Sequence, residues 1–133
     1  MKAKELKQAK VFQVELDKIR PLTFDFNTLS ELQELGYEDP FEAIVGMESM
    51  NLKAIKSLFY ASLMAGQLAE NEDVDFDLSI NKVGNLLGQK MQFDNEAFQV
   101  LSGILGQAVA DFFPEPEVKD EEEAEAKEED PKN

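Results

Sequence analysis

Three aspartates at alternate positions, Asp73, Asp75 and Asp77, come closest in this sequence to a motif with known chemistry. Carboxylates at positions 1, 3 and 5 open the calcium-binding loop of EF-hand proteins. That loop also needs glycine at its sixth position and glutamate at its twelfth, where this chain has Leu78 and Gly84. We therefore interpret the segment as a solvated acidic loop and expect no metal site.

Paired carboxylates suggest a second kind of chemistry, general acid–base catalysis, at Glu31 with Glu34 and at Glu38 with Asp39. Such pairs are common in a sequence this acidic, and Glu31 and Asp39 also fit helix-capping positions. The chain has no His and no Cys, so its serines lack an imidazole base and it has no thiolate nucleophile. Its glycines match neither a phosphate loop nor a dinucleotide fingerprint. We expect no enzyme activity and no cofactor.

The net charge of -15 over 133 residues divides unevenly along the chain. Residues 1–20 hold six Lys/Arg and three Asp/Glu, whereas residues 21–113 hold four and fifteen. Residues 114–133 hold three Lys and ten Asp/Glu and almost no apolar residues, which is typical of a disordered tail. We predict a basic arm over 1–10, one globular domain over 11–113 and a disordered acidic tail over 114–133. The acidity argues against nucleic-acid binding.

Membrane insertion is also not expected, because no apolar run approaches the length of a bilayer span. The lysines near the N-terminus are not followed by the apolar stretch of a signal peptide. We therefore expect a cytoplasmic protein.

The elements that would position these residues are a β-hairpin and a series of helices. Residues 11–16 and 22–26 alternate apolar and polar side chains, which predicts two strands with Phe12, Phe24 and Phe26 facing one core. The predicted fold class is therefore α+β, mainly α, with an N-terminal hairpin followed by about five short-to-medium helices. Helix starts are predicted at a Thr28–Glu31 capping box and at Asp39, Asn51, Ser79 and Asp94 or Asn95, and helix ends at Gly36, Gly88 and Pro114.

Glycine within the last predicted helix is unexpected, because each glycine costs about 1 kcal/mol relative to alanine. Gly103 and Gly106 both lie there. We interpret them as sites of close packing against another helix or against a partner.

Methionine and aromatic side chains are the candidates for contact with another protein. Met47, Met50 and Met64 with Phe41 and Phe59 could form a soft, adaptable surface, although core packing is the favoured interpretation. Two adjacent aromatics at the end of the last helix are hard to bury together, so one is expected to pack inward and the other to be a contact point. The predicted partner-binding residues are Phe41, Met47, Met50, Phe112 and Phe113.

The order of motifs over residues 10–113 resembles the tail assembly chaperones of long-tailed bacteriophages that infect Gram-positive bacteria. The resemblance rests on F-D-F (Phe24–Phe26), T-L-S-E-L (Thr28–Leu32), D-P-F-E-A-I (Asp39–Ile44), L-K-A-I-K-S-L-F-Y-A-S-L (Leu52–Leu63), S-I-N-K-V-G-N-L-L (Ser79–Leu87) and a last helix before a Pro/Glu tail. These are patterns of apolar and capping residues, and no catalytic or binding motif comes with them.

The resemblance implies a binding protein. Such chaperones are thought to coat the apolar, helical tape measure protein until tail tube protein polymerises around it, and they are absent from the mature virion. The family commonly has a longer form, made by a −1 frameshift, which is thought to recruit tail tube protein. Pro131-Lys132-Asn133 can be encoded by CCA-AAA-AAC, which contains a slippery A-AAA-AAC run. We expect this chain to be the shorter product in the cytoplasm of an infected bacterium.

Two other interpretations stay open from the residues alone. An acidic inhibitor that mimics DNA and occupies a host nucleic-acid-binding protein would also be strongly negative. Weak self-association between the basic arm of one copy and the acidic tail of another is a further possibility, although two unattached ends are the favoured interpretation.

Overall fold

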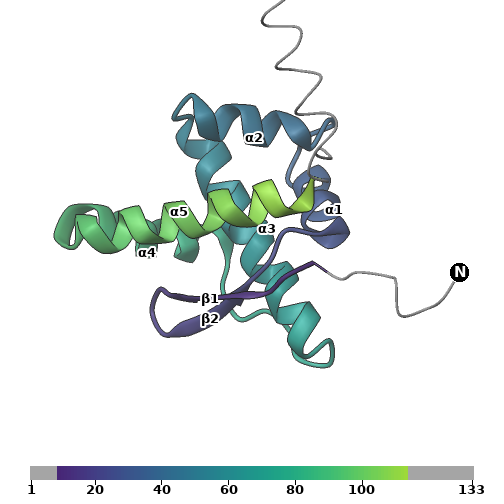
Figure 1. Ribbon diagram of the computed structural model, residues 1–133, viewed down its shortest axis with the longest axis horizontal. Helices are drawn as coiled ribbons and strands as arrows, with labels where there is room; N and C mark the ends of the chain where they lie inside the picture. Colours follow the sequence, from purple (N-terminus) through teal and green to yellow (C-terminus); the bar gives the residue numbers. More distant parts are fainter. Residues whose placement is uncertain (1–8, 114–133) are drawn as a thin grey trace, which may run out of the picture.

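The computed structural model describes residues 9–113, in which a two-stranded hairpin is followed by five helices. This confirms the predicted α+β, mainly α class. The predicted acidic tail and residues 1–8 of the predicted basic arm lie outside the described residues. The elements, shown in Figure 1, are β1 (Phe12–Glu15), β2 (Ile19–Leu22), α1 (Phe26–Glu34), α2 (Phe41–Glu48), α3 (Leu52–Glu70), α4 (Ile80–Phe93) and α5 (Asn95–Phe112).

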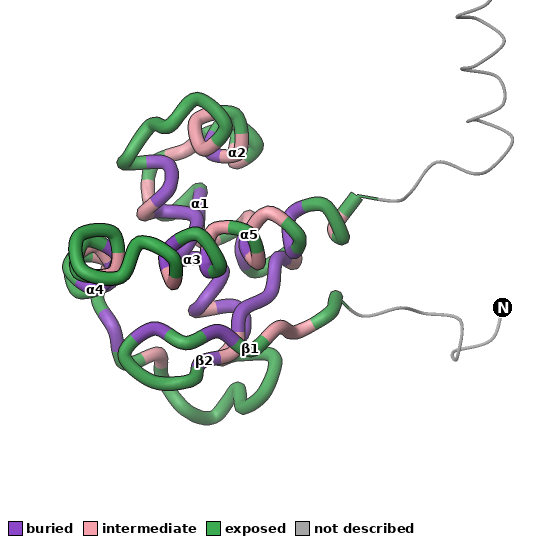
Figure 2. The backbone as a smooth tube through the Cα atoms, turned by 60° about the vertical axis from the view of Figure 1, so that its left-hand side comes forward, coloured by how far each residue is buried: buried purple, intermediate pink, exposed green. Residues whose placement is uncertain are grey.

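Helix α3 is the centre of the fold. It packs against β2, α1, α2 and α4, and ten of its 19 residues are buried, including Leu58 and Phe59. Figure 1 shows α5 crossing α3, with α2 on one side of α5 and the hairpin on the other. The burial colouring of Figure 2 follows this arrangement, since the outer turns of α2 and α4 are exposed. None of the described helices is long and apolar enough to cross a membrane.

The hairpin is shorter than predicted, and its second strand lies earlier in the chain. β1 and β2 are antiparallel, with Val14 opposite Arg20 and Phe12 opposite Leu22. The prediction of a strand over 22–26 was wrong because Asp25 begins a helix. Phe26, expected in the core, is the first residue of α1 and is 77% exposed.

The capping box of α1 also lies one turn earlier than predicted. The Asp25 carboxylate accepts the Thr28 N–H at 3.2 Å, and the Thr28 hydroxyl accepts the Asp25 N–H at 3.0 Å. Thr28 therefore occupies the N3 position and Asp25 the N-cap, so that Glu31 has no capping role. Gly36 does end the helix as predicted, with a φ of 112° that glycine adopts without strain.

The other helix boundaries follow the sequence closely. Asn51, Ser79 and Asp94 each accept a backbone N–H three residues ahead, which confirms them as N-caps. Pro40 is the N-cap of α2, one residue later than predicted, while the Asp39 carboxylate accepts the Phe41 N–H at 3.0 Å. The predicted end of α4 at Gly88 was wrong, because the helix continues to Phe93. Helix α5 ends at Phe112, just before Pro114.

Close packing occurs at a different glycine from the two that the sequence indicated. A Cβ built on Gly66 of α3 would collide with the Pro21 carbonyl and lie 2.6 Å from the Leu22 nitrogen. At Gly66 the backbones of α3 and β2 therefore lie too close together for a side chain. A Cβ at Gly103 or Gly106 meets nothing within 4 Å, so no helix of the described residues requires those glycines.

Candidate partner-binding surface

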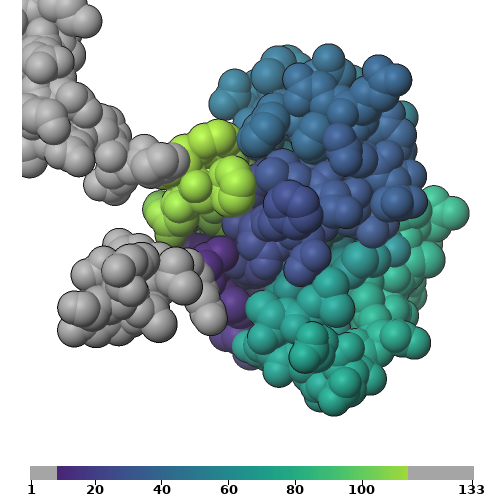
Figure 3. Space-filling model, turned by 90° about the vertical axis from the view of Figure 1, so that its right-hand side faces the viewer, coloured from purple at the N-terminus to yellow at the C-terminus, as the bar shows by residue number. Residues whose placement is uncertain are grey.

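An aromatic cluster joins the end of α5 to the start of α2. The Phe112 ring lies 5.2 Å from the buried Phe24 ring in an edge-to-face arrangement, and Phe113 lies 5.9 Å from Phe41. The two adjacent aromatics contact each other at 5.3 Å. In the space-filling view the end of α5 lies against the segment that contains α1 and α2 (Figure 3). Phe112 packs inward, whereas Phe113 and Phe41 are 42% and 39% exposed.

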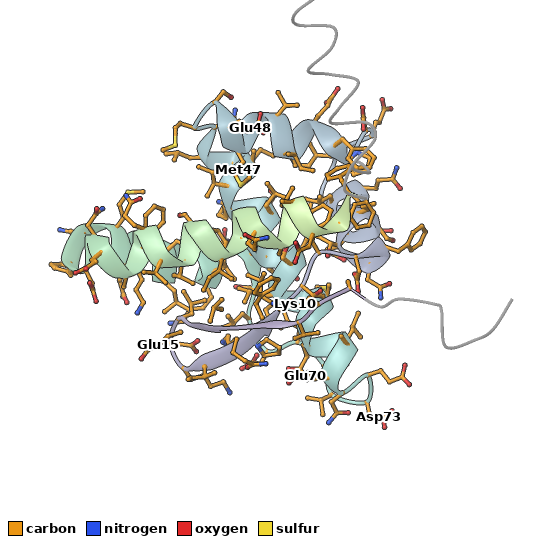
Figure 4. The ribbon with its side chains drawn as sticks, viewed as in Figure 1. Lys10, Glu15, Met47, Glu48, Glu70 and Asp73 are labelled. Carbon is orange, nitrogen blue, oxygen red and sulfur yellow. The ribbon has the colours of Figure 1, made fainter. Side chains whose placement is uncertain are left out.

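A hollow of about 220 Å³ lies further along the same pair of helices. Its walls come from the end of α2 and from α5, and α3 contributes its base. Met47 lies between α2 and α5 in Figure 4. The lining side chains are mainly apolar: Met47, Glu48, Met50, Ile55, Phe59, Phe98, Ser102 and Leu105. All five predicted partner-binding residues therefore lie in the aromatic cluster or in this hollow, which we call together the α2–α5 seam.

Met50 adopts an unfavourable backbone conformation at the rim of the hollow. Its φ of 65° places it in the left-handed region, which costs a non-glycine residue about 1–2 kcal/mol. The Asn51 N–H donates to the Gly46 carbonyl at 2.8 Å and the Met50 N–H donates to the Met47 carbonyl, which is the helix-ending arrangement that usually carries glycine. Here a methionine side chain that is 62% exposed takes that position. Residues held in strained conformations concentrate at functional sites.

A second and larger hollow, of about 480 Å³, lies between α3 and α4. It shares Ile55 and Phe98 with the α2–α5 seam, so the two hollows are neighbours. Sequence reasoning did not predict this surface, which we call the α3–α4 groove. Two features of the sequence could have indicated it: the glycines Gly84 and Gly88, one helical turn apart on α4, and Leu52 at the start of α3. Leu52 is 66% exposed in the structure.

The remaining apolar candidates have structural roles. Phe59 also lines the hollow, but it is 1% exposed and belongs to the core, and Met64 is half-buried in α3. Core packing, the interpretation favoured from the sequence, is therefore correct for Phe59 and wrong for Met50.

The acidic segment lies at the far end of α3 from Met47, as the labels of Glu70 and Asp73 show in Figure 4. Asp77 is not simply solvated, since it forms an ion pair with the buried Arg20. The hydrogen bonds from Arg20 hold the pKa of Asp77 below its ordinary value. Among residues 9–113, no group of three or more acidic side chains is arranged to hold a metal ion.

Of the carboxylate pairs considered for catalysis, Glu31 and Glu34 lie together on α1. Desolvation raises the pKa of Glu31 on α1, and the nearby Glu34 adds to the rise. The pKa of Tyr60 is also raised, mainly by desolvation and to a lesser extent by the negative charge of Glu31. Neither Glu31 nor Glu34 belongs to the ion pairs of the described residues, which involve Lys18 and Arg20 with Asp17 and Asp77.

Comparison of the chain with protein-family models, curated proteins and solved structures finds no match. The surface described above is therefore interpreted from its own chemistry and from the resemblance in the sequence.

Proposed function

We propose that this chain is a non-catalytic chaperone of phage tail assembly. It binds the tape measure protein and keeps that protein soluble until tail tube protein polymerises around it. The observation that carries the proposal is the α2–α5 seam, which comprises an apolar hollow and the exposed aromatics Phe41 and Phe113. A hollow with apolar walls fits the apolar face of an amphipathic helix, which is one of the general modes of peptide recognition.

Methionine suits a chaperone that must accept many different helical segments. Its unbranched thioether side chain changes conformation easily and fills irregular gaps, so Met-rich surfaces bind diverse targets. Met47 and Met50 stand on the same side of the hollow, and both contact space that a partner side chain would fill. A tape measure protein is expected to be long, helical and apolar, so tolerance of different segments is more useful to its chaperone than selectivity.

The energetics favour weak binding by many copies. Burying one leucine side chain contributes about 1.5–3 kcal/mol, and a hollow of this size accommodates few such side chains. Association also costs translational and rotational freedom, which leaves a single copy with modest affinity. Many copies bound along one tape measure chain would together cover its apolar surface. Because each copy binds weakly, each would leave readily when the tube assembles. A net charge of -15 would keep the copies apart in the cytoplasm of the infected bacterium.

The proposal extends to the longer product expected from the slippery run near Asn133. That form would carry the same seam and would bring tail tube protein to the coated tape measure. Neither form would remain in the mature virion. Codons that interrupt the A-run, or the lack of an overlapping −1 frame, would remove this part of the proposal.

Co-expression with the tape measure protein of the same genome tests the function. The full chain should keep the tape measure protein in the soluble fraction and should co-purify with it. Met50→Gly removes the exposed side chain and suits the backbone, so retention should fall while the fold is kept. Phe26→Ala is the matched control, because it removes an exposed apolar side chain on α1 that lines neither hollow. A tape measure protein that precipitates equally with and without the chain would refute the proposal.

A further inference from the structure

The α3–α4 groove has a charge opposite to that of the domain around it. Residues 21–113 contain four lysines and fifteen Asp/Glu residues. Two of those lysines, Lys53 and Lys56, line the groove, and no carboxylate does. The rest of the lining is apolar or uncharged, including Leu52, Ile55 and Met91. A strongly acidic domain therefore presents one apolar hollow with a cationic edge.

Each of the two lysine side chains has a neighbour that helps to hold it in place. The Lys53 ammonium lies 5.4 Å from the centre of the Tyr37 ring, within the range of a cation–π contact. The Lys56 side chain crosses Gly84, where an added Cβ would lie 2.8 Å from the Lys56 Cδ. Neither ammonium group takes part in the ion pairs of the part of the chain that the structure describes. Both lysines therefore line the groove without a carboxylate partner among the described residues.

The α4 side of the groove has room for a closely packed helix. Gly84 and Gly88 lie one turn apart on α4 and both line the hollow. A Cβ on Gly88 would meet nothing within 4 Å, so the surface there is open backbone. A partner backbone can approach such a surface more closely than one covered by side chains.

We propose that the α3–α4 groove binds an amphipathic helix whose apolar stripe is flanked by carboxylates. The stripe would enter between α3 and α4, and the carboxylates would reach Lys53 and Lys56. This inference rests on the proposed function: the groove adjoins the α2–α5 seam at Ile55 and Phe98 and would take a further tape measure segment of this chemistry. The negative net charge of the chain repels an acidic ligand. Any preference for an acidic helix must therefore come from the lysines of the groove itself. At about 0.15 M salt the screening length is near 8 Å, so charges farther than that from the ligand contribute little to its binding.

Two synthetic 18-residue helical peptides test the inference with the full chain. Both carry the same leucine stripe, and the residues beside the stripe are glutamate in one peptide and lysine in the other. Fluorescence anisotropy should show that the Glu-flanked peptide binds about tenfold more tightly, as two charged contacts of about 0.7 kcal/mol each would produce. Equal binding of the two peptides would overturn the proposal. Tighter binding of the Lys-flanked peptide would also overturn it, because that is the preference that the negative net charge of the chain alone predicts.

Charge reversal identifies the responsible residues. The double variant Lys53→Glu/Lys56→Glu should reverse the preference between the two peptides. Lys82→Glu/Lys90→Glu makes the same change in net charge on α4, at two residues that do not line the groove, and should keep the preference. If both double variants change it equally, the groove is not the site.

Filling the groove gives a test that does not depend on charge. Gly88→Leu places a side chain in open space, so the fold should be kept while binding of the Glu-flanked peptide falls at least tenfold. Gly103→Leu is the matched control, since Gly103 is equally unobstructed and lies on α5 outside both hollows. Unchanged binding by Gly88→Leu would contradict the proposal.

A third peptide distinguishes two possible occupants of the groove, a helix of another protein and the acidic segment 114–133 of this chain. A peptide with the sequence of residues 114–133 is as acidic as the proposed ligand but has no apolar stripe. It should bind at least tenfold more weakly than the Glu-flanked peptide, and equal affinity would overturn the proposal in favour of the tail. If the tape measure protein co-purifies equally with Lys53→Glu/Lys56→Glu, only this inference fails. If the Glu-flanked peptide binds but the tape measure protein does not, the ligand chemistry of the groove stands, and the proposed function and the tape measure segment as occupant both fail.

Discussion

Arg20 and Asp77, 57 residues apart in the chain, form a two-point ion pair, with Nη1 2.8 Å from Oδ1 and Nη2 3.1 Å from Oδ2. The same guanidinium also binds Asp17 through Nε at 2.6 Å and Nη2 at 2.9 Å. Arg20 is 4% exposed and its guanidinium carbon lies 5.9 Å from the Phe76 ring. One buried arginine thus connects the hairpin to the segment that precedes α4.

Replacing Arg20 should destabilise the protein markedly. Arg20→Ala removes four charged hydrogen bonds and leaves two carboxylates facing an empty space. Because Asp17 and Asp77 are themselves partly solvated, we expect a loss of about 2–3 kcal/mol in the free energy of unfolding. Urea unfolding at pH 7 measures it. Lys18→Ala, which removes an exposed pair at 4.0 Å, should change stability by less than about 0.5 kcal/mol, and a comparable loss there would contradict the assignment.

The same ion pairs predict an acid-dependent loss of stability. Arg20 lowers the pKa of Asp17 from 3.8 to about 2 and lowers the pKa of Asp77 as well. Both carboxyls bind protons more weakly in the folded state, so their stabilisation is complete above the unfolded pKa. It should disappear as the pH falls from about 5 to about 2. The urea concentration at the midpoint of unfolding, measured between about pH 5 and about pH 2, should decline less steeply with falling pH for Arg20→Met than for the unchanged chain. Parallel pH dependences of the two proteins would contradict the prediction.

The relocated capping box makes a prediction that separates two neighbouring acids. Asp25→Ala should lower the free energy of unfolding by about 1 kcal/mol, because the Thr28 N–H loses the carboxylate that caps the helix. Glu31→Gln should slightly raise stability at pH 7, because desolvation raises the pKa of Glu31 and makes its charge unfavourable. Thermal unfolding of the two variants shows the order, and a larger loss for Glu31→Gln would restore the capping box predicted at Thr28 and Glu31.

Glycine substitutions should have opposite effects in two helices. Gly66→Ala forces a methyl group into the backbone of β2 and should cost at least about 2–3 kcal/mol. Gly103→Ala adds a methyl group in open space and should raise stability by about 0.5–1 kcal/mol through the helix propensity of alanine. The difference is measurable by thermal unfolding. Loss of stability in Gly103→Ala would mean that a contact not formed by residues 9–113 requires that glycine.

Met50→Gly should separate stability from binding. Glycine accepts the left-handed backbone at this position, so the free energy of unfolding should rise by about 0.5–1 kcal/mol. Retention of the tape measure protein should fall, because the exposed methionine side chain at the seam is lost. A variant that is more stable and equally able to bind would show that the strain at Met50 has no role in binding.

Local signals in the sequence predicted most of the helical framework. Asn51, Ser79 and Asp94 each cap a helix as expected, because a cap involves atoms only three residues apart. The hairpin was harder, since 22–26 alternates apolar and polar side chains like a strand. Asp25 can begin a helix or continue a strand. Phe24 is buried as the strand prediction required, but Asp25 caps a helix with Thr28 and Phe26 is left exposed.

The candidate binding residues were predicted by type, and the fold decided how they are arranged. Phe41 and Phe113 were named separately, and only the antiparallel passage of α2 and α5 brings their rings to 5.9 Å. The α3–α4 groove was missed, because Lys53 and Lys56 read as ordinary solvated charges until α4 lies beside them.

The sequence by itself determined the absence of His and Cys, the distribution of charge and the residues that begin most helices, because these depend on composition or on neighbouring atoms. Only the tertiary structure decided that Arg20 meets Asp77, that Gly66 lies against Pro21 and that two hollows flank Phe98. Those relationships join segments far apart in the chain. They arise when helices pack on α3, because burial of apolar surface selects one arrangement of the elements among many that local signals allow.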